Sequence, residues 1–141
     1  MKIRIAISDT DRAACFAVRK AVFMGEQGVS EAEEWDGLDD ACTHFLAASA
    51  DGPAGCARLL PKGYIAKVQR VAVMPAYRGT GLGRQIMQAV LDHARHEGFT
   101  TVILDSQTHA LGFYEALGFI AHGPEFDDAG IPHRSMRLAL D

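Results

Sequence analysis

The chain has 141 residues, of which 48% are hydrophobic and 23% charged, so we expect one ordinary globular domain over residues 1–141. Its formal net charge of −4 argues against a nucleic-acid partner, and no apolar run approaches the roughly 18 residues that a membrane span needs. Three cysteines are too few for a disulfide framework, which favours a reducing, cytoplasmic location.

The first half of the chain predicts a strand, a helix and a run of antiparallel strands. Isoleucine at every second position of residues 2–7 indicates a half-buried strand, and Ser8 or Asp9 can cap the helix that follows. Residues 24–42 break the helical pattern and are expected mostly as loop or short helix. Strands are then predicted at 43–50, 54–61 and 64–73, with a turn at 51–53.

The second half alternates helices and strands. Apolar residues recur at helical spacing from Leu82, and Gly98 is suited to end that helix. Residues 109–117 predict a short helix that Gly118 can end. Strands are predicted at 99–105, 119–123 and 133–140, with a turn at 127–130. The order indicates a mixed α/β (α+β) fold in one domain.

Residues 78–83, RGTGLG, form a glycine loop between a predicted strand and a predicted helix. A P-loop is excluded because no lysine follows a glycine in the required pattern, and the dinucleotide pattern G-x-G-x-x-G fails because its last position falls on Arg84 or Ile86. A tight turn that needs positive φ is the simplest alternative. Three glycines beside two arginines, in front of free helix N–H groups, favour an anion site instead.

Two motifs in this part of the chain resemble those of the GNAT superfamily of N-acetyltransferases. The segment RVAVMPAYRGTGLG is similar to its acyl-CoA loop, R/Q-x-x-G-x-G/A, and SQTHALGFYEALGF at 106–119 is similar to its second motif, a helix with FYE-x-LGF after a strand. VRKAVFMGEQGV, the acidic stretch 31–40 and EFDDAGIPHRSM resemble the small ElaA-like branch. The resemblance covers nearly the whole chain, with the motifs in the same order.

The resemblance implies a single GNAT domain, with a central, mixed, mostly antiparallel sheet in which two parallel strands splay apart. It implies acetyl-CoA as the acetyl donor, with the pantetheine arm in the gap and the pyrophosphate on the glycine loop. A backbone N–H near Val71 would polarise the thioester carbonyl. The residues implied to bind the donor are Val71, Ala72, Val73, Arg78, Gly79, Thr80, Gly81, Leu82, Gly83, Arg84, Gln107 and Phe113.

Tyr114 stands where the superfamily usually has its general acid. A phenol within reach of the sulfur can protonate the departing thiolate of coenzyme A. The alternative is a core tyrosine on one apolar stripe with Ala110 and Leu117. The intact GFYEALGF segment favours the acid.

The acceptor side is less defined. The candidates to contact the acceptor are Glu26, Gln27, Trp35, His44 and His133. Some group must take the proton of the attacking amine, and the candidates for this base are Glu26, Asp36, His44, His109 and His133. The six acidic residues within 31–40 could attract a cationic acceptor, or form a solvated loop. Trp35 could anchor that loop or wall the pocket.

The function expected from these features is acetyl transfer from acetyl-CoA to a primary amine of a small molecule or peptide. The alternatives are a non-catalytic acyl-CoA-binding module and a nucleotide-binding oxidoreductase, which the failed glycine pattern disfavours. No metal site is expected, because His93 and His96 lie on a polar face without an H-E-x-x-H pattern. Dimers are common in the superfamily, so a homodimer is a possible assembly.

Overall fold

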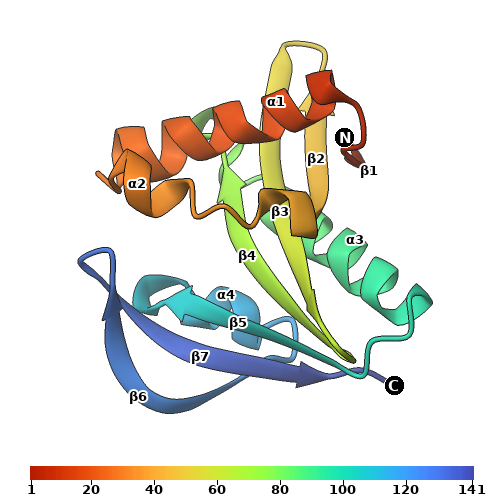
Figure 1. Ribbon diagram of the computed structural model, residues 1–141, viewed down its shortest axis with the longest axis vertical. Coiled ribbons are helices and arrows are strands. Elements are labelled where there is room, and N and C mark those ends of the chain that lie inside the picture. The colour runs from red at the N-terminus through yellow and green to blue at the C-terminus, as the bar shows by residue number, and fades with distance from the viewer.

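A seven-stranded sheet runs through the computed structural model, which describes residues 1–141. The strand order is β1-β2-β3-β4-β5-β7-β6, and β4 with β5 forms the parallel pair in an otherwise antiparallel sheet (Figure 1). The strands are β1 (Lys2–Ile5), β2 (Thr43–Ser49), β3 (Gly52–Lys62), β4 (Ile65–Val73), β5 (Thr101–Gln107), β6 (Ile120–Asp128) and β7 (Ile131–Ala139). The predicted mixed sheet is confirmed.

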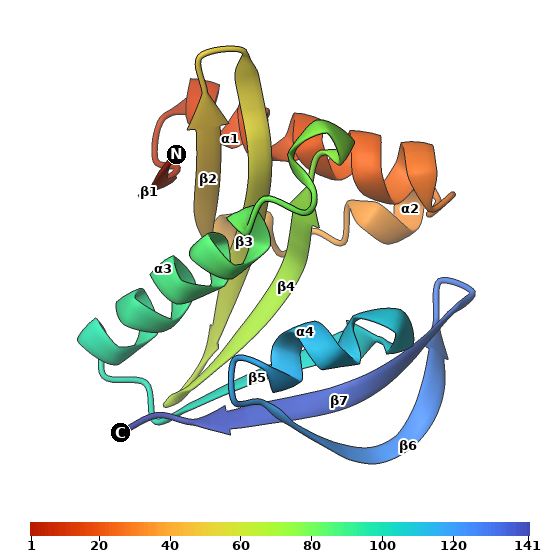
Figure 2. The ribbon, with the colours of Figure 1, turned by 180° about the vertical axis from the view of Figure 1, so that it is seen from behind.

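Helices cover both faces of this sheet. Figures 1 and 2 show α1 and α2 on one face and α3 and α4 on the other. The helices are α1 (Asp9–Arg19), α2 (Glu31–Glu34), α3 (Leu82–His96) and α4 (Leu111–Glu115). The hydroxyl of Ser8 accepts a hydrogen bond from the Asp11 N–H, so Ser8 is the cap that starts α1.

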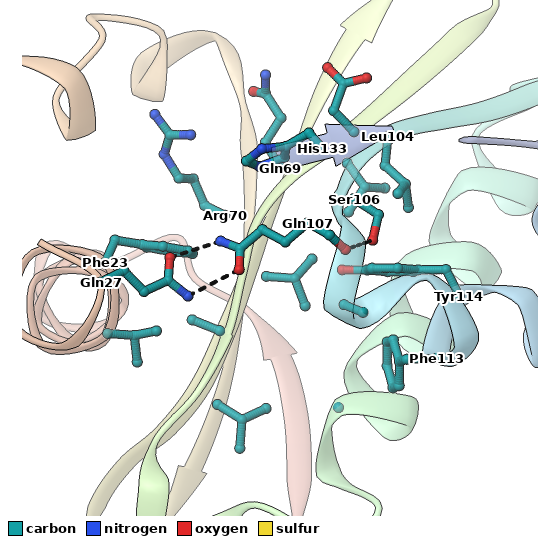
Figure 3. A pocket seen from close by; sticks show the side chains of 18 of the residues that line it. Phe23, Gln27, Gln69, Arg70, Leu104, Ser106, Gln107, Phe113, Tyr114 and His133 are labelled. Atoms are coloured by element: carbon teal, nitrogen blue, oxygen red, sulfur yellow. Dashed lines mark hydrogen bonds between the residues drawn. The ribbon is translucent and has the colours of Figure 1, made fainter. Parts of the chain in front are cut away.

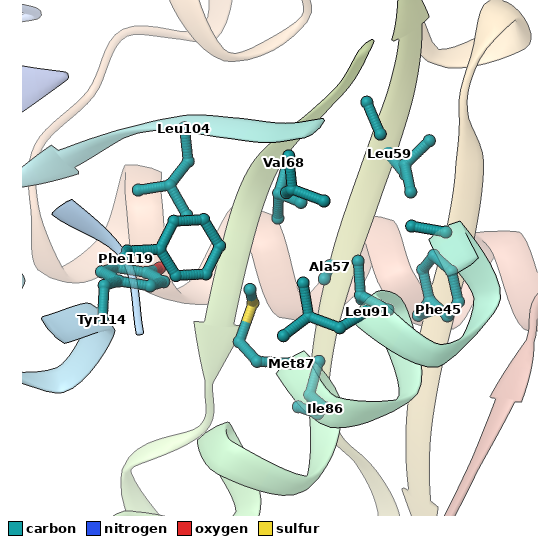
Figure 4. Close-up of a cluster of buried hydrophobic side chains, with 14 of the residues drawn as sticks. Phe45, Ala57, Leu59, Val68, Ile86, Met87, Leu91, Leu104, Tyr114 and Phe119 are labelled. Carbon is teal, nitrogen blue, oxygen red and sulfur yellow. The ribbon is translucent and has the colours of Figure 1, made fainter. Parts of the chain in front are cut away.

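Two apolar clusters hold the layers together. The larger one lies between the sheet and the face of α3 that carries Ile86, Met87 and Leu91, and it extends to Tyr114 and Phe119 beside α4 (Figure 4). The smaller one joins α1 to the opposite face of β2, β3 and β4. Both helices therefore fix β4, which forms one wall of the site described below.

Gly55 in β3 lies where α3 and β4 leave no room for a side chain. A Cβ at this position would lie 2.7 Å from Ile86 Cδ1 and 2.9 Å from the Ala72 carbonyl oxygen. We expect Gly55→Ala to lower the free energy of unfolding by about 1–3 kcal/mol, because the backbone of β4 must move to admit the methyl group. Denaturant unfolding measures this loss. Gly112→Ala is the control, since its Cβ meets open space, and an equal unfolding midpoint for both variants would contradict the packing argument.

Three elements differ from the sequence prediction. The strand predicted over 2–7 ends at Ile5, and Ile5 and Ile7 are exposed, because β1 is an edge strand of the sheet. The helix α1 continues with wider π-type turns over Lys20–Glu26, a segment predicted to become loop from residue 24. The acidic residues of 125–128, partly predicted as turn, belong to β6, and the turn is confined to Ala129 and Gly130, both with positive φ.

The strands β4 and β5 separate after a short paired segment. Their parallel register covers only Ile65–Lys67 against Thr101–Ile103, so the carboxyl-terminal halves of the two strands are unpaired with each other. This is the predicted splay, and it opens the sheet between α1 and α4 (Figure 1).

Candidate active site

A cavity of about 570 Å³ occupies the opening between the splayed strands. Its walls are β4, β5, the π-type end of α1, α4 and one residue each from β6 and β7 (Figure 3). The predicted site residues that line it are Glu26, Gln27, Val71, Ala72, Val73, Arg78, Gly83, Gln107, Phe113, Tyr114 and His133. Segments from the whole length of the chain therefore meet at one place.

The backbone of β4 offers free hydrogen-bonding groups to this cavity. Alternate residues of a strand direct their backbone groups to opposite sides. The Met74 N–H donates to the Ala54 carbonyl of β3 at 2.8 Å, so the groups of Val73 point toward β5. The Val73 carbonyl on that side accepts a hydrogen bond from Arg78 Nε at 3.0 Å rather than from a strand.

A β-bulge interrupts β4 in front of these residues. Cys56 faces Ala72 and Arg58 faces Gln69, so β4 carries one residue more than β3 in this interval. Arg70 sits within it with φ 56°, a conformation that non-glycine residues rarely adopt. The bulge redirects the backbone of residues 69–71 at the cavity wall.

The glycine loop supplies an open helix start beside the cavity. Gly79 and Gly81 have φ of 74° and 84°, and Gly81 is the N-terminal cap of α3, where no side chain bonds the first N–H groups. Gly83 serves packing instead, since a Cβ there would lie 3.3 Å from Phe113. Uncapped N–H groups and the positive end of a helix dipole can hold an anion, and both lie at this end of the cavity.

Glu26 and Arg78 form an ion pair across the cavity mouth. Arg78 Nη1 and Nη2 lie 2.8 and 2.6 Å from the two carboxylate oxygens of Glu26. The hydrogen bond from Arg78 lowers the pKa of Glu26. Glu26 is therefore a poor candidate for the base that takes the proton of an amine.

Tyr114 is both a core residue and a residue that faces the cavity, so it fits both alternatives considered from the sequence. Its ring packs edge-to-face on Phe113 and Phe119 within the larger core, and only 9% of the residue is exposed. Its hydroxyl points into the cavity toward Ser106 of β5 (Figure 3). Burial raises the pKa of Tyr114 to about 12, so the phenol stays protonated at neutral pH.

A pair of amide side chains bridges the cavity. Gln107 Nε2 donates to Gln27 Oε1 at 2.8 Å, and Gln27 Nε2 donates to Gln107 Oε1 at 3.4 Å (Figure 3). His109 Nε2 lies 2.6 Å from the same Gln107 oxygen. Gln107 was predicted to bind acetyl-CoA and Gln27 to contact the acceptor amine. The two side chains thus touch each other where the two halves of the cavity meet.

Trp35 and His44 do not reach the cavity. Trp35 packs edge-to-face on Phe16, and the Arg19 guanidinium carbon lies over the Trp35 ring, 5.0 Å from the ring centroid. Trp35 therefore anchors the 31–40 segment to α1. His44 is buried, its Nε2 lies 2.9 Å from the Asp39 carbonyl, and burial lowers its pKa. Their expected contact with an acceptor is not supported by this placement, since both side chains are used in packing.

The acidic stretch pairs with arginines of the protein itself. Arg19 lies 2.7 Å from Glu34 and 2.6 Å from Asp39, while Arg58 bonds Asp39 at 2.9 Å and also bonds Asp36. Arg19, Glu34 and Arg58 are almost fully buried. Half of the six acids therefore form an internal ion-pair network, and neither a docking surface nor a fully solvated loop describes the segment.

This network reaches the bulge in β4. Arg70 Nε lies 3.2 Å from Glu34 Oε2, and Arg70 also pairs with Asp36 at 3.4 Å. Asp36 is held by both Arg58 and Arg70, and the same contacts exclude it as a free base. The network therefore ties the segment between α1 and β2 to the strand that carries the open backbone.

Sequence reasoning missed several cavity residues on the central strands. Lys67, Gln69, Asp105 and Ser106 all line the cavity, and Lys67 pairs with Asp105 at 3.2 Å. Lys67 and Gln69 alternate along β4, and Asp105 alternates with Gln107 along β5; this pattern was the available signal, because such alternation in a central strand marks a polar face. Ser106 does not fit this alternation, since it lies on the opposite face of β5 from Asp105. Phe23 lines the cavity from the π-type turns after α1 and Asp128 lines it from β6, and no pattern in the sequence singles them out.

No metal cluster, disulfide or membrane-spanning helix is found in the structure. The structure brings no three His, Cys, Asp or Glu side chains together as a metal site, and its three cysteines are free. Its longest helix, α3 with 15 residues, is too short to cross a membrane, and no other helix qualifies.

Comparison with known proteins shows the family to which this chain belongs. The family model for the acetyltransferase (GNAT) domain matches residues 10–140. ElaA of Escherichia coli is 31% identical over 128 residues, which are 87% of this chain and 84% of ElaA, and its crystal structure superimposes with a TM-score of 0.86. An acyl-CoA N-acyltransferase from Pseudomonas aeruginosa is 29% identical, with a TM-score of 0.86 over 98% of this chain and 97% of that one.

A more distant structure shows the same fold. A Bacillus subtilis acetyltransferase crystallised in complex with CoA is 17% identical and superimposes with a TM-score of 0.74 over 99% of this chain and 98% of that one. The family-model match spans the splayed strands, the glycine loop and the helix with Tyr114. The protein belongs to the GNAT family of acetyltransferases, close to its ElaA-like members.

Proposed function

We propose that the protein transfers the acetyl group of acetyl-CoA directly to a primary amine of a small molecule or peptide. The observation that carries the proposal is the cavity between the splayed strands, which joins an anion site at the start of α3 to a buried, protonated Tyr114. A thioester arm attached to a pyrophosphate needs these two features at the two ends of one channel.

The donor would lie along β4. The pyrophosphate is assigned to the N–H groups from Arg78 to Arg84, and the pantetheine arm to the free backbone edge at Val71 and Val73, with Ala72 between them paired to β3. Gln107 and Phe113 would contact the arm from the opposite wall. The coenzyme A complex of the structurally similar Bacillus subtilis acetyltransferase supports a donor of this class.

The chemistry follows from the same placement. The amine nitrogen attacks the thioester carbon, and the N–H at Val71, beside the bulge, stabilises the negative charge that develops on the carbonyl oxygen. The C–S bond then breaks, and the Tyr114 hydroxyl protonates the thiolate. A direct transfer of this kind needs no covalent enzyme intermediate, so Cys15, Cys42 and Cys56 have no role in it.

Calorimetric titration separates this proposal from its alternatives. We expect coenzyme A and acetyl-CoA to bind at micromolar concentration and NAD not to bind. Binding of NAD without coenzyme A would instead indicate a nucleotide-dependent oxidoreductase. Binding of coenzyme A without thiol release across a broad amine panel would indicate a non-catalytic acyl-CoA-binding module.

Two glycines at opposite ends of α3 provide a matched test of the donor site. Gly81 and Gly98 both have φ of 84°, and a Cβ at either position meets open space. Alanine at either position strains the backbone equally, by about 1 kcal/mol. We expect only Gly81→Ala to weaken coenzyme A binding, by about tenfold, or roughly 1.4 kcal/mol. Equal affinities for the two variants in calorimetry would place the pyrophosphate elsewhere.

A further inference from the structure

We propose that His133 is the catalytic base, which takes the proton of the acceptor amine on its Nε2 atom. This inference rests on the proposed function and adds to it the base, which none of the residues assigned to acetyl-CoA supplies. His133 is the only imidazole that lies deep in the cavity, where 9% of the residue is exposed.

The hydrogen bond of His133 fixes which ring nitrogen is free. His133 Nδ1 lies 2.7 Å from the Ile131 carbonyl oxygen, which can only accept, so Nδ1 carries the hydrogen. In the neutral ring, Nε2 then holds the lone pair. The Phe126 ring stacks on the imidazole at 5.9 Å and 25°, which restrains the direction of that lone pair.

The position of His133 in the sheet places it on the acceptor side. It pairs with Gln107 across β5 and β7, and paired residues point to the same face of a sheet. Gln107 lies on the cavity wall between Gln27 and Tyr114 (Figure 3). His133 therefore faces the region that an amine must cross to reach a thioester carbon held near Val71 and Tyr114.

The other titratable groups around the cavity are less suited to this role. Arg78 holds Glu26, while Lys67 and the Ser135 hydroxyl hold Asp105 at 3.2 and 2.9 Å. A carboxylate bound to a cation is a weak base. Arg70 faces the cavity as a cation and is paired with Glu34 and Asp36.

Two further groups stand at the rim. Asp128 is exposed at the end of β6, and a solvated carboxylate accepts protons far less readily than an imidazole does. His109 uses its Nε2–H on the Gln107 oxygen and is exposed. His133 is thus the group that combines burial, a free lone pair and the absence of a carboxylate partner.

The proposed step balances as follows. The neutral amine attacks the thioester carbon, a C–N bond forms, and the nitrogen becomes positively charged and much more acidic. His133 Nε2 takes that proton, the C–S bond breaks, and the thiolate takes the proton of the Tyr114 hydroxyl. The imidazolium then releases a proton to water and the phenolate regains one, which restores both groups.

The substitution His133→Asn tests this role, because the asparagine amide can still donate to the Ile131 carbonyl but carries no base. We expect unchanged thermal stability and coenzyme A affinity, with kcat at pH 8 lowered by about a hundredfold. The substitution His96→Asn on the exposed side of α3 is the control, and it should leave kcat unchanged. Wild-type kcat in His133→Asn would overturn the proposal.

The pH dependence distinguishes a base from a purely structural histidine. Deprotonation of the amine affects both enzymes alike, so the ratio of wild-type to His133→Asn kcat isolates the imidazole. A base must be neutral to accept the proton, so this ratio should rise with pH and then level off once the imidazole is neutral. A ratio that does not vary with pH would overturn the proposal. So would a wild-type-like pH dependence of kcat in His133→Asn together with its loss in His109→Gln.

One measurement is independent of turnover. Nitrogen-15 NMR of the protein should report His133 as the Nδ1–H tautomer, and an Nε2–H tautomer would refute the role even if acetyl transfer is observed. Conversely, an inactive wild-type enzyme with the Nδ1–H tautomer would count against the proposed function and not against the geometry of His133.

Discussion

Replacing Tyr114 with phenylalanine is expected to lower kcat by about a hundredfold or more, with little change in coenzyme A affinity. The substitution removes the hydroxyl that faces the cavity and leaves the ring contacts with Phe113 and Phe119 in place. Steady-state thiol release and calorimetric titration measure the two quantities. The loss should fall on kcat, because protonation of the thiolate is needed only as the C–S bond breaks.

Tyr64→Phe is the control for this experiment, because Tyr64 is 77% exposed and lies outside the cavity. The raised pKa of Tyr114, about 12, adds a prediction for the wild-type enzyme. An acid must keep its proton to act, so activity should not fall on the alkaline side until the pH approaches that value. Full turnover by Tyr114→Phe would remove Tyr114 from the acid role.

Replacing Arg58 with methionine is expected to lower the free energy of unfolding by about 3 kcal/mol or more. Arg58 has no exposed surface, and its removal leaves Asp36 without its main partner and Asp39 with Arg19 alone. Chemical denaturation measures the loss. Arg95→Met is the control, because Arg95 pairs with Asp92 on the exposed side of α3 and should change stability by less than about 0.5 kcal/mol.

The same network predicts how stability responds to acid. Burial opposes ionisation of Asp36, but the hydrogen bonds from Arg58 and the Leu38 N–H outweigh it and lower its pKa to about 2. A carboxyl with a lowered folded-state pKa stabilises the fold above its unfolded value near 4 and loses that contribution as the pH falls toward 2. Wild-type stability should decline in this window, and the decline should be weaker in Arg58→Met. Parallel pH curves for the two proteins would contradict the network.

The network also explains why a segment far from the cavity matters to it. Arg70 belongs both to the bulge in β4 and to the ion pairs with Glu34 and Asp36. Positive φ at a non-glycine residue persists only where surrounding contacts hold it. The acidic stretch therefore acts on the site by fixing the backbone of β4 rather than by meeting a ligand.

The donor half of the site could be predicted from the sequence because its signals are local. The glycine loop and the helix with Tyr114 are continuous segments. The spacing of the glycines excludes two other phosphate loops, and the resemblance of both segments to known motifs indicates the family. The splay of β4 and β5 follows from the family fold, and the register confirms it. The start of α3 at Leu82 also follows from local chemistry, since the preceding Gly81 readily adopts the positive φ of the cap.

The acceptor half could not be predicted to the same extent because it depends on contacts between distant segments. The pairing of Glu34, Asp36 and Asp39 with arginines from α1, β3 and β4 leaves no pattern in the sequence. Trp35 could equally anchor the segment or wall the pocket until its contact with Arg19 was known. The π-type turns that bring Gln27 to Gln107 are likewise set by tertiary packing.

The most direct test is the product of the reaction. The protein is incubated with acetyl-CoA that carries an isotopically labelled acetyl group and with a panel of primary amines, and the products are identified by mass spectrometry. We predict a labelled acetyl group on the nitrogen of at least one amine, with one free coenzyme A formed per N-acetyl product and both lost in Tyr114→Phe. Coenzyme A binding without any N-acetyl product, or thiol release without acetylated amine, would contradict the proposed transfer.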